Sequence, residues 1–221
     1  MHLKERKNNV KGKLFYSICF VLLATIVILW FVKNSVETHY EEDYDALIEA
    51  YYDNQSIYSP AVPDNANTDL YVCEQENTVT ETQHYYNNVD SIIRVTDLGI
   101  ELPVCKGNFK YDMEAYRLSV YSNSMNLGET TYTIMGHHSV ALDVAFGWLD
   151  QIEEGTLVTV EQNSVIYEYV VTDITIDYAS ELSYLFSLED KDIVYLATCD
   201  YSLGNGNRIV YRVVKCERRS K

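Results

Sequence analysis

The chain opens with one long apolar run, and shorter runs separated by polar residues follow it. Residues 14–32 carry no charge and as a helix would span about 29 Å, the thickness of a bilayer's hydrocarbon core. Residues 41–55 have apolar positions at helical spacing behind an acidic first turn, which predicts an amphipathic helix docked on the domain that follows. Residues 56–82 are polar and include two prolines, which is typical of a loop.

Beyond residue 85 the pattern changes to short strands. Apolar or alternating runs occur at 89–96, 100–105, 131–135, 157–161, 165–176, 193–199 and 209–215. The alternation with period two in 165–171 is expected where one face of a strand is buried. Seven or eight such strands predict a mainly β fold, and a closed or nearly closed barrel would leave no exposed edge. Short helices are predicted at 111–120, 144–152 and 180–188.

These patterns predict four parts: a basic tail at 1–13, a transmembrane anchor at 14–32, a linker with the N-terminal helix at 33–84, and a β-rich domain at 85–221. A cleavable signal peptide is the alternative to the anchor. The apolar run is long for a signal peptide, and residues 30–33 lack the small side chains of a cleavage site.

Charge is distributed unevenly along the chain. Residues 1–33 hold 6 of the 17 basic residues and one of the 33 acidic residues, which leaves a formal charge of −21 beyond them. The positive-inside rule then predicts a cytoplasmic N-terminus and an extracellular domain. The acidic domain disfavours nucleic acid as a partner and favours a cationic amine substrate, although solubility alone is a simpler reason for the acidity.

Candidate chemistry gathers at the ends of three predicted strands. Cys199 ends the run 193–199, and a free thiol, with a pKa of about 8.5, needs a base or cation nearby to react at neutral pH. His137 follows the run 131–135 and is a candidate general acid and base. Arg208 opens the final strand and offers rigid donors for a developing oxyanion, although alone it is as typical of a surface ion pair. Together the three residues favour a thiol acyltransferase.

Two other interpretations of these residues are weaker. His138 adjoins His137, but adjacent side chains of an extended chain point opposite ways, so only one histidine can face the thiol. A metal site of His137, His138 and Cys199 is disfavoured because no fourth ligand is evident, and no EF-hand-like spacing indicates calcium.

The other cysteines leave the redox state open. Cys19 lies in the apolar run, and Cys73, Cys105 and Cys216 show no CxxC spacing. A bridge from Cys105 to either Cys73 or Cys216 and a set of scattered, partly buried thiols are both compatible with the sequence.

The order of these motifs resembles the sortase family. An apolar strand enters Gly136-His137, Leu196-Ala-Thr-Cys199 follows with its cysteine 62 positions after the histidine, and Arg208 follows nine residues later, all behind an N-terminal anchor. The segment LGIELPVCKG at 98–107 looks like the family's early strand and proline-containing turn. The resemblance covers about residues 85–215 and implies the eight-stranded sortase β-barrel with short helices.

The resemblance also implies a reaction. Cys199 would attack the scissile carbonyl of a C-terminal sorting signal in a secreted protein, His137 would protonate the leaving amine, and Arg208 would stabilise the substrate. An amine of a peptidoglycan precursor, or another amine acceptor, would then resolve the thioester, with no metal or organic cofactor. In the substrate-binding site the resemblance places Thr198, Ala197 and Tyr201.

The subclass and the final acceptor stay open. The sequence around Cys199 and the N-terminal helix look like class B, whereas the compact spacing is closer to classes A and D. Class C is less similar, because neither its aromatic lid motif nor a C-terminal membrane span is found. A thiol peptidase that gives the thioester to water and a non-catalytic barrel that binds cell-wall peptides or proteins remain alternatives.

Overall fold

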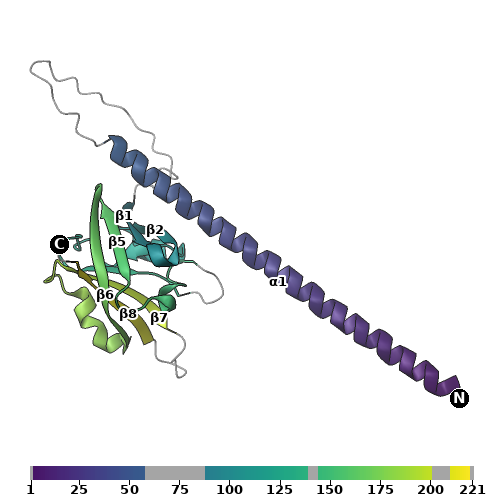
Figure 1. Ribbon diagram of the computed structural model, residues 1–221. Coiled ribbons are helices and arrows are strands. Elements are labelled where there is room, and N and C mark those ends of the chain that lie inside the picture. The colour runs from purple at the N-terminus through teal and green to yellow at the C-terminus, as the bar shows by residue number, and fades with distance from the viewer. Residues whose placement is uncertain (1, 58–87, 139–143, 201–209, 220–221) are drawn as a thin grey trace, which may run out of the picture. The chain divides into compact units, whose positions relative to one another are not determined.

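The computed structural model describes residues 2–57, 88–138, 144–200 and 210–219, with side chains described from 18 to 53 in the first helix (Figure 1). The chain divides into two compact units, Met1–Glu41 and Glu42–Lys221. Helix α1 spans His2–Ile57 and contributes to both units.

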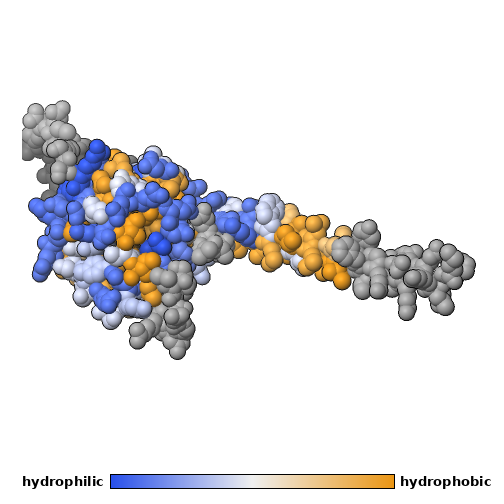
Figure 2. All heavy atoms as spheres, turned by 60° about the horizontal axis from the view of Figure 1, so that its bottom comes forward, coloured by the Kyte–Doolittle hydropathy of each residue, from blue (hydrophilic) through white to orange (hydrophobic). Residues whose placement is uncertain are grey.

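The first unit is the N-terminal part of α1. From Ile18 to Val32 its large apolar side chains are exposed, and Figure 2 shows them as a hydrophobic surface along the helix. Ile18–Asp53 is long and apolar enough to cross a membrane by length and composition, which makes it a candidate span. The predicted apolar helix is therefore present, whereas the boundaries at 13, 32 and 84 stay predictions.

The second unit is built on eight strands that close into a barrel in the order β1-β2-β3-β4-β7-β8-β6-β5 (Figure 1). They are β1 (Val89–Val95), β2 (Ile100–Cys105), β3 (Leu118–Val120), β4 (Tyr132–Met135), β5 (Leu157–Gln162), β6 (Val165–Tyr178), β7 (Ile193–Asp200) and β8 (Val210–Arg218). Two pairs, β2 with β3 and β4 with β7, are parallel, and the others are antiparallel. The predicted eight-stranded barrel is confirmed.

Alternation along the strands separates an inner from an outer face. Inward side chains form the main core, which includes Ile93, Val95, Val104, Tyr132, Ile134, Val158, Val160, Tyr169, Val171, Val194, Leu196, Val214 and Cys216. The intervening residues of β7 and β8 face outward, where Ala197 and Val213 pack with Leu182 and Leu185 of the 3-10 helix η3 (Ala179–Phe186). This outer cluster covers part of the face that leads to Cys199.

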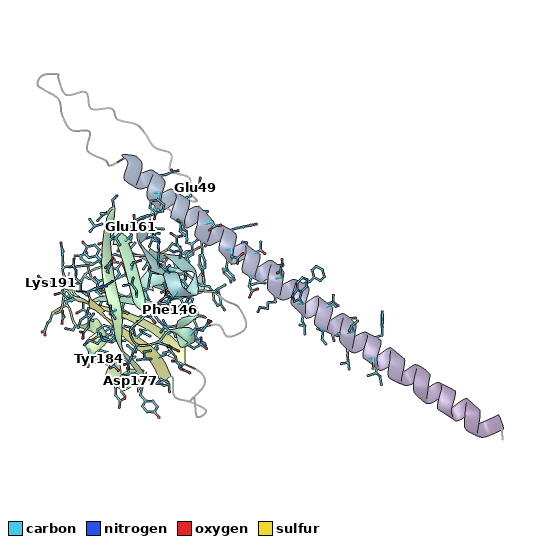
Figure 3. The ribbon with its side chains drawn as sticks, in the orientation of Figure 1. Glu49, Phe146, Glu161, Asp177, Tyr184 and Lys191 are labelled. Atoms are coloured by element: carbon cyan, nitrogen blue, oxygen red, sulfur yellow. The ribbon has the colours of Figure 1, made fainter. Side chains whose placement is uncertain are left out.

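The predicted docking of the amphipathic helix is confirmed within the second unit. Tyr44, Leu47 and Tyr51 of α1 are buried, as their helical spacing requires. The Tyr51 hydroxyl donates to the Glu161 carbonyl oxygen at 3.2 Å, and Figure 3 shows Glu161 near the end of the helix that carries Glu49.

Two of the predicted short helices differ from the structure. The stretch 111–120 holds the end of α3 (Phe109–Glu114) and then β3, because the chain turns at Tyr116, which has a left-handed φ of 57°. The stretch 144–152 forms an isolated bridge at Ala145, a turn and only the short 3-10 helix η2 (Leu149–Gln151). Its apolar periodicity instead comes from burial in the core, where Phe146 lies.

Candidate active site

The parallel pairing of β4 with β7 brings the two motifs of interest together. Met135 is the register partner of Ala197, and the Gly136 amide donates to the Ala197 carbonyl oxygen at 3.3 Å. β4 ends at Met135, and His137 and Cys199 each lie two residues beyond this last register pair, at the same end of two neighbouring strands, which a sheet spaces about 5 Å apart. Residues 62 positions apart in sequence thus meet at the ends of paired strands.

The two residues also share a face of the barrel. Tyr195 and Ala197 belong to the outer cluster, so alternation directs Cys199 outward as well. On β4, Met135 packs against the same outer cluster. His137 lies two residues after Met135, so in an extended chain its side chain points to the same face. Both His137 and Cys199 are partly exposed, which leaves them accessible from outside the barrel.

Gly136 permits the side chains of Leu118 and Phe146 to pack closely against the chain just after β4. A Cβ atom at this position would lie 2.5 Å from Leu118 Cδ2 and 3.0 Å from Phe146 Cδ2, closer than side chains tolerate. The Gly136 carbonyl oxygen accepts a hydrogen bond of 2.7 Å from the buried Thr198 hydroxyl. The chain is therefore fixed on both sides immediately before His137.

His137 is held by one ring contact and one backbone bond. Its ring lies 4.9 Å from the Tyr116 ring between centroids, with the planes tilted by 39°. Its carbonyl oxygen accepts a hydrogen bond from the Phe146 amide at 3.0 Å. His138 is more constrained, because it pairs with Ala145 in an isolated bridge and its buried Nδ1 has no hydrogen-bond partner among the described residues.

The structure describes some, but not all, of the residues that the sequence predicts at the substrate site. Ala197 and Thr198 are buried, and Thr198 uses its hydroxyl to hold Gly136. Arg208 and Tyr201 lie outside the residues that the structure describes.

Sequence reasoning missed three residues around the site. Asp200, only 5% exposed, forms an ion pair of 3.3 Å with Arg212 across β7 and β8. Arg212 is the residue after Tyr211, the register partner of Cys199. The adjacency of Asp200 to Cys199 was a usable signal, whereas nothing in the sequence pointed to Tyr116.

Cys199 differs from the other two described cysteines of the barrel. Cys105 and Cys216 are fully buried, and no disulfide joins them. Burial raises the pKa of the Cys216 thiol to about 12 and raises the pKa of Cys105 further. Both thiols therefore stay protonated and unreactive at neutral pH, whereas Cys199 is partly exposed at a strand end. Among the described residues, no group of three His, Cys, Asp or Glu side chains is placed to hold a metal ion.

Comparison with known proteins agrees with this arrangement. A family model, "Sortase domain", matches residues 93–216, more than half of the chain. The chain therefore belongs to the sortase family, whose members are in general cysteine transpeptidases.

Solved structures of sortases share the fold. Sortase A from Listeria monocytogenes is 22% identical with a TM-score of 0.51, over 60% of this chain and 88% of that one. Sortase C-1 from Actinomyces oris is 18% identical with a TM-score of 0.51, over 79% and 99%. Sortase A from Corynebacterium diphtheriae is 16% identical with a TM-score of 0.51, over 86% and 93%. No curated protein matches the sequence.

Proposed function

We propose that this sortase is membrane-anchored and uses Cys199 as its nucleophile, His137 as its general acid and base, and Arg208 to stabilise the oxyanion. Its substrates are secreted proteins with a C-terminal sorting signal, which it joins to an amine of the cell wall. The observation that supports the proposal is the parallel pairing of β4 with β7, because His137 and Cys199 each lie two residues beyond its last register pair, at the same end of the two strands.

The reaction follows from these roles. The Cys199 thiolate attacks the scissile carbonyl carbon, and the tetrahedral intermediate carries a negative charge that the Arg208 guanidinium stabilises. Collapse breaks the peptide bond, and His137 gives a proton to the leaving amine while Cys199 keeps the acyl group as a thioester. An incoming amine then attacks the thioester, His137 takes its proton, and the Cys199 thiolate is released.

The burial of the other thiols supports the choice of Cys199. Cys105 and Cys216 lie in the core with raised pKa values, so neither supplies a thiolate at neutral pH. Of these three cysteines, Cys199 is the one that is partly exposed, and it lies at the strand end that also carries His137. Ala197 and Thr198 contribute to substrate binding by shaping the strand end, and Tyr201 is also assigned to substrate binding.

The anchor and the charge distribution support the location and the acceptor. Basic residues precede the apolar helix and acidic residues follow it, which favours a cytoplasmic N-terminus and an extracellular barrel. The formal charge of −21 beyond residue 33 raises the local concentration of a cationic amine at the barrel surface. A peptidoglycan precursor with a free amino group fits this chemistry.

The experiment uses the full chain in detergent micelles with a mixed library of LPXTG-like and NPQTN-like peptides, with and without a glycine or diaminopimelate-type amine. Mass spectrometry is expected to show a thioester on Cys199 and a ligated product that depends on the amine. Cleavage without ligation would indicate a thiol peptidase instead. A Cys199 that forms no adduct and is alkylated no faster than Cys216 would favour a binding barrel.

Arg208 has its own test. Arg208→Lys keeps the positive charge but loses the planar fork of donors, so we expect a loss of about 100-fold in kcat/KM. The matched control is His138→Ala, which alters a neighbour of His137 with no role in the mechanism and is expected to change kcat/KM by less than about threefold. Equal effects of the two changes would contradict the role given to Arg208.

A further inference from the structure

We propose that Tyr44 of α1 is a positioning residue for His137, so that the docked helix sets the orientation of the catalytic imidazole. This inference rests on the proposed function, because it assigns His137 its role. It adds a residue 93 positions upstream, in a helix that lies outside the barrel strands.

The Tyr44 hydroxyl joins two separate segments of the barrel unit. It donates a hydrogen bond to the Tyr116 carbonyl oxygen and accepts one from the Ala145 amide at 3.1 Å. Tyr44 itself is 7% exposed, so water does not easily replace either bond. One buried oxygen therefore holds the chain at 116 and the chain at 145 in a fixed relation.

These two segments are the ones that contact His137. The Tyr116 ring lies against the His137 ring, and Ala145 directly precedes Phe146, whose amide binds the His137 carbonyl oxygen. Ala145 also pairs with His138 in the isolated bridge. His137 thus contacts both segments that Tyr44 links, one through its ring and the other through its backbone carbonyl.

Both residues bonded to Tyr44 have unfavourable backbone conformations. Tyr116 has a φ of 57° and Ala145 a φ of 49°, in the left-handed region that residues with a Cβ seldom adopt. Such conformations cost free energy and persist only where surrounding contacts impose them. Tyr44 supplies one such contact to each residue, so its hydroxyl helps to impose the backbone that presents the Tyr116 ring to His137.

The neighbouring residue of the helix reinforces this placement. Asp43 accepts two hydrogen bonds from Arg117, at 3.0 Å from Nε and 2.8 Å from Nη2. Arg117 directly follows Tyr116, and its side chain is 6% exposed. Two successive helix residues therefore hold two successive residues of the turn that contacts His137.

A merely structural role for Tyr44 is the alternative, and Tyr51 provides the control for it. Tyr51 is also buried on α1, and its hydroxyl likewise donates to a backbone carbonyl, of Glu161, and accepts from a backbone amide, of Asn163 at 3.1 Å. Those bonds lie at the β5–β6 hairpin, whereas the ring contact of His137 is with Tyr116 and its backbone bond is with Phe146. Tyr44→Phe and Tyr51→Phe therefore remove the same chemistry from the same helix.

The experiment measures turnover and the imidazole signal of the full chain in micelles. Tyr44→Phe is expected to lower kcat about tenfold with KM within about twofold, because substrate binding is intact while the base is misaligned. Tyr51→Phe is expected to leave kcat and KM unchanged. With ¹³C-labelled histidine, the His137 ring resonances, assigned with His137→Gln, should shift in Tyr44→Phe and not in Tyr51→Phe, with His39 as the internal reference.

A second variant covers the case in which Tyr44→Phe does not fold. Tyr116→Asn keeps the carbonyl oxygen and tolerates the left-handed backbone but removes the ring, so it should reproduce the loss in kcat. The inference is overturned if Tyr44→Phe and Tyr51→Phe give the same kcat and the His137 resonances do not move. If instead His137→Gln retains full activity, the proposed function fails, while the resonance shifts still report whether Tyr44 positions the ring.

Discussion

The inner and outer faces of the β7–β8 ribbon place the same residue type in opposite settings. Cys216 faces inward opposite Val194, is fully buried, and belongs to the main core. Cys199 faces outward opposite Tyr211, is partly exposed, and follows the row of Tyr195 and Ala197. One face of the ribbon stabilises the barrel, and the other carries the chemistry that we propose.

The difference in exposure between the two cysteines depends on their position along the strand as much as on the face that they occupy. Ala197 faces outward too, but η3 covers it, and it is fully buried in the outer cluster. Cys199 lies two residues further on, at the strand end, where this cover stops. Of the two described cysteines of this ribbon, the accessible thiol is therefore the one at which the outer face and the strand end coincide.

The largest effect expected is the loss of turnover in Cys199→Ala. Removal of the nucleophile should lower kcat at least about 1,000-fold, because the thioester can no longer form. The unfolding free energy should change by less than about 1 kcal/mol, since the side chain lies outside the core. Peptide cleavage and denaturant unfolding of the full chain check the two parts.

The matched change on the inner face is Cys216→Ala. It should leave kcat within about twofold and cost about 1 kcal/mol of unfolding free energy, as for other small deletions in a core. Full activity in Cys199→Ala would refute the assignment of the nucleophile.

The second prediction compares the rate at which Cys199 is alkylated with the rates of the buried cysteines. At pH 8 iodoacetamide should modify Cys199 at least about 100-fold faster than Cys105 or Cys216, which burial keeps protonated and inaccessible. Peptide mapping by mass spectrometry gives the individual rates. The difference should disappear in denaturant, and a difference that persists there would mean that burial is not its cause.

The third prediction concerns the loss of unfolding free energy when a core side chain on the inner face is truncated. Leu196→Ala removes a fully buried side chain between Ala197 and Tyr195, and should cost about 2–5 kcal/mol of unfolding free energy. Turnover per folded molecule should stay within about threefold. Denaturant unfolding followed by the fluorescence of Trp148, which is 2% exposed in the core, measures the loss.

The smallest effect expected is a fall in stability at high pH. In the folded state burial raises the pKa of Cys216 to about 12, above the roughly 8.5–9 of a free thiol, so the unfolded chain loses this proton first. The contribution of the buried thiol is complete below about pH 9 and is lost as the pH rises from there towards 12. This titration adds at most about 1.4 kcal/mol of destabilisation per pH unit. Cys216→Ala should show a shallower fall between pH 9 and 10 than the parent protein.

Strong periodic patterns were sufficient to predict most of the fold. The runs that became β1, β2, β5, β6 and β7 were recognised to within about two residues, because alternation reports directly on a half-buried strand. β3 was missed because it has only three residues, Leu118–Val120, too few to show a period. The turn at Tyr116 was also invisible, since a positive φ in a tyrosine is imposed by tertiary contacts.

The candidate site was predictable in part. His137 and Cys199 follow recognisable strands, so their residue types and order carried the resemblance to sortases. Their proximity depends on a parallel pairing between β4 and β7 that no local pattern encodes. The contacts of Tyr44 with the chain at 116 and 145 are equally long-range, so the sequence indicated a buried helix face but no link to the histidine.

The pairing of β4 with β7 also determines when the proposed site can form as the chain folds. The two strands are about 60 residues apart, and closing a loop of that length costs more entropy than closing the β5–β6 hairpin. β7 is in turn paired along its whole length with β8, which follows it in the chain. Until β8 has formed and the barrel has closed, the folding chain carries Cys199 without His137 held alongside, so the nucleophile and base that we propose are assembled only in the last steps of folding.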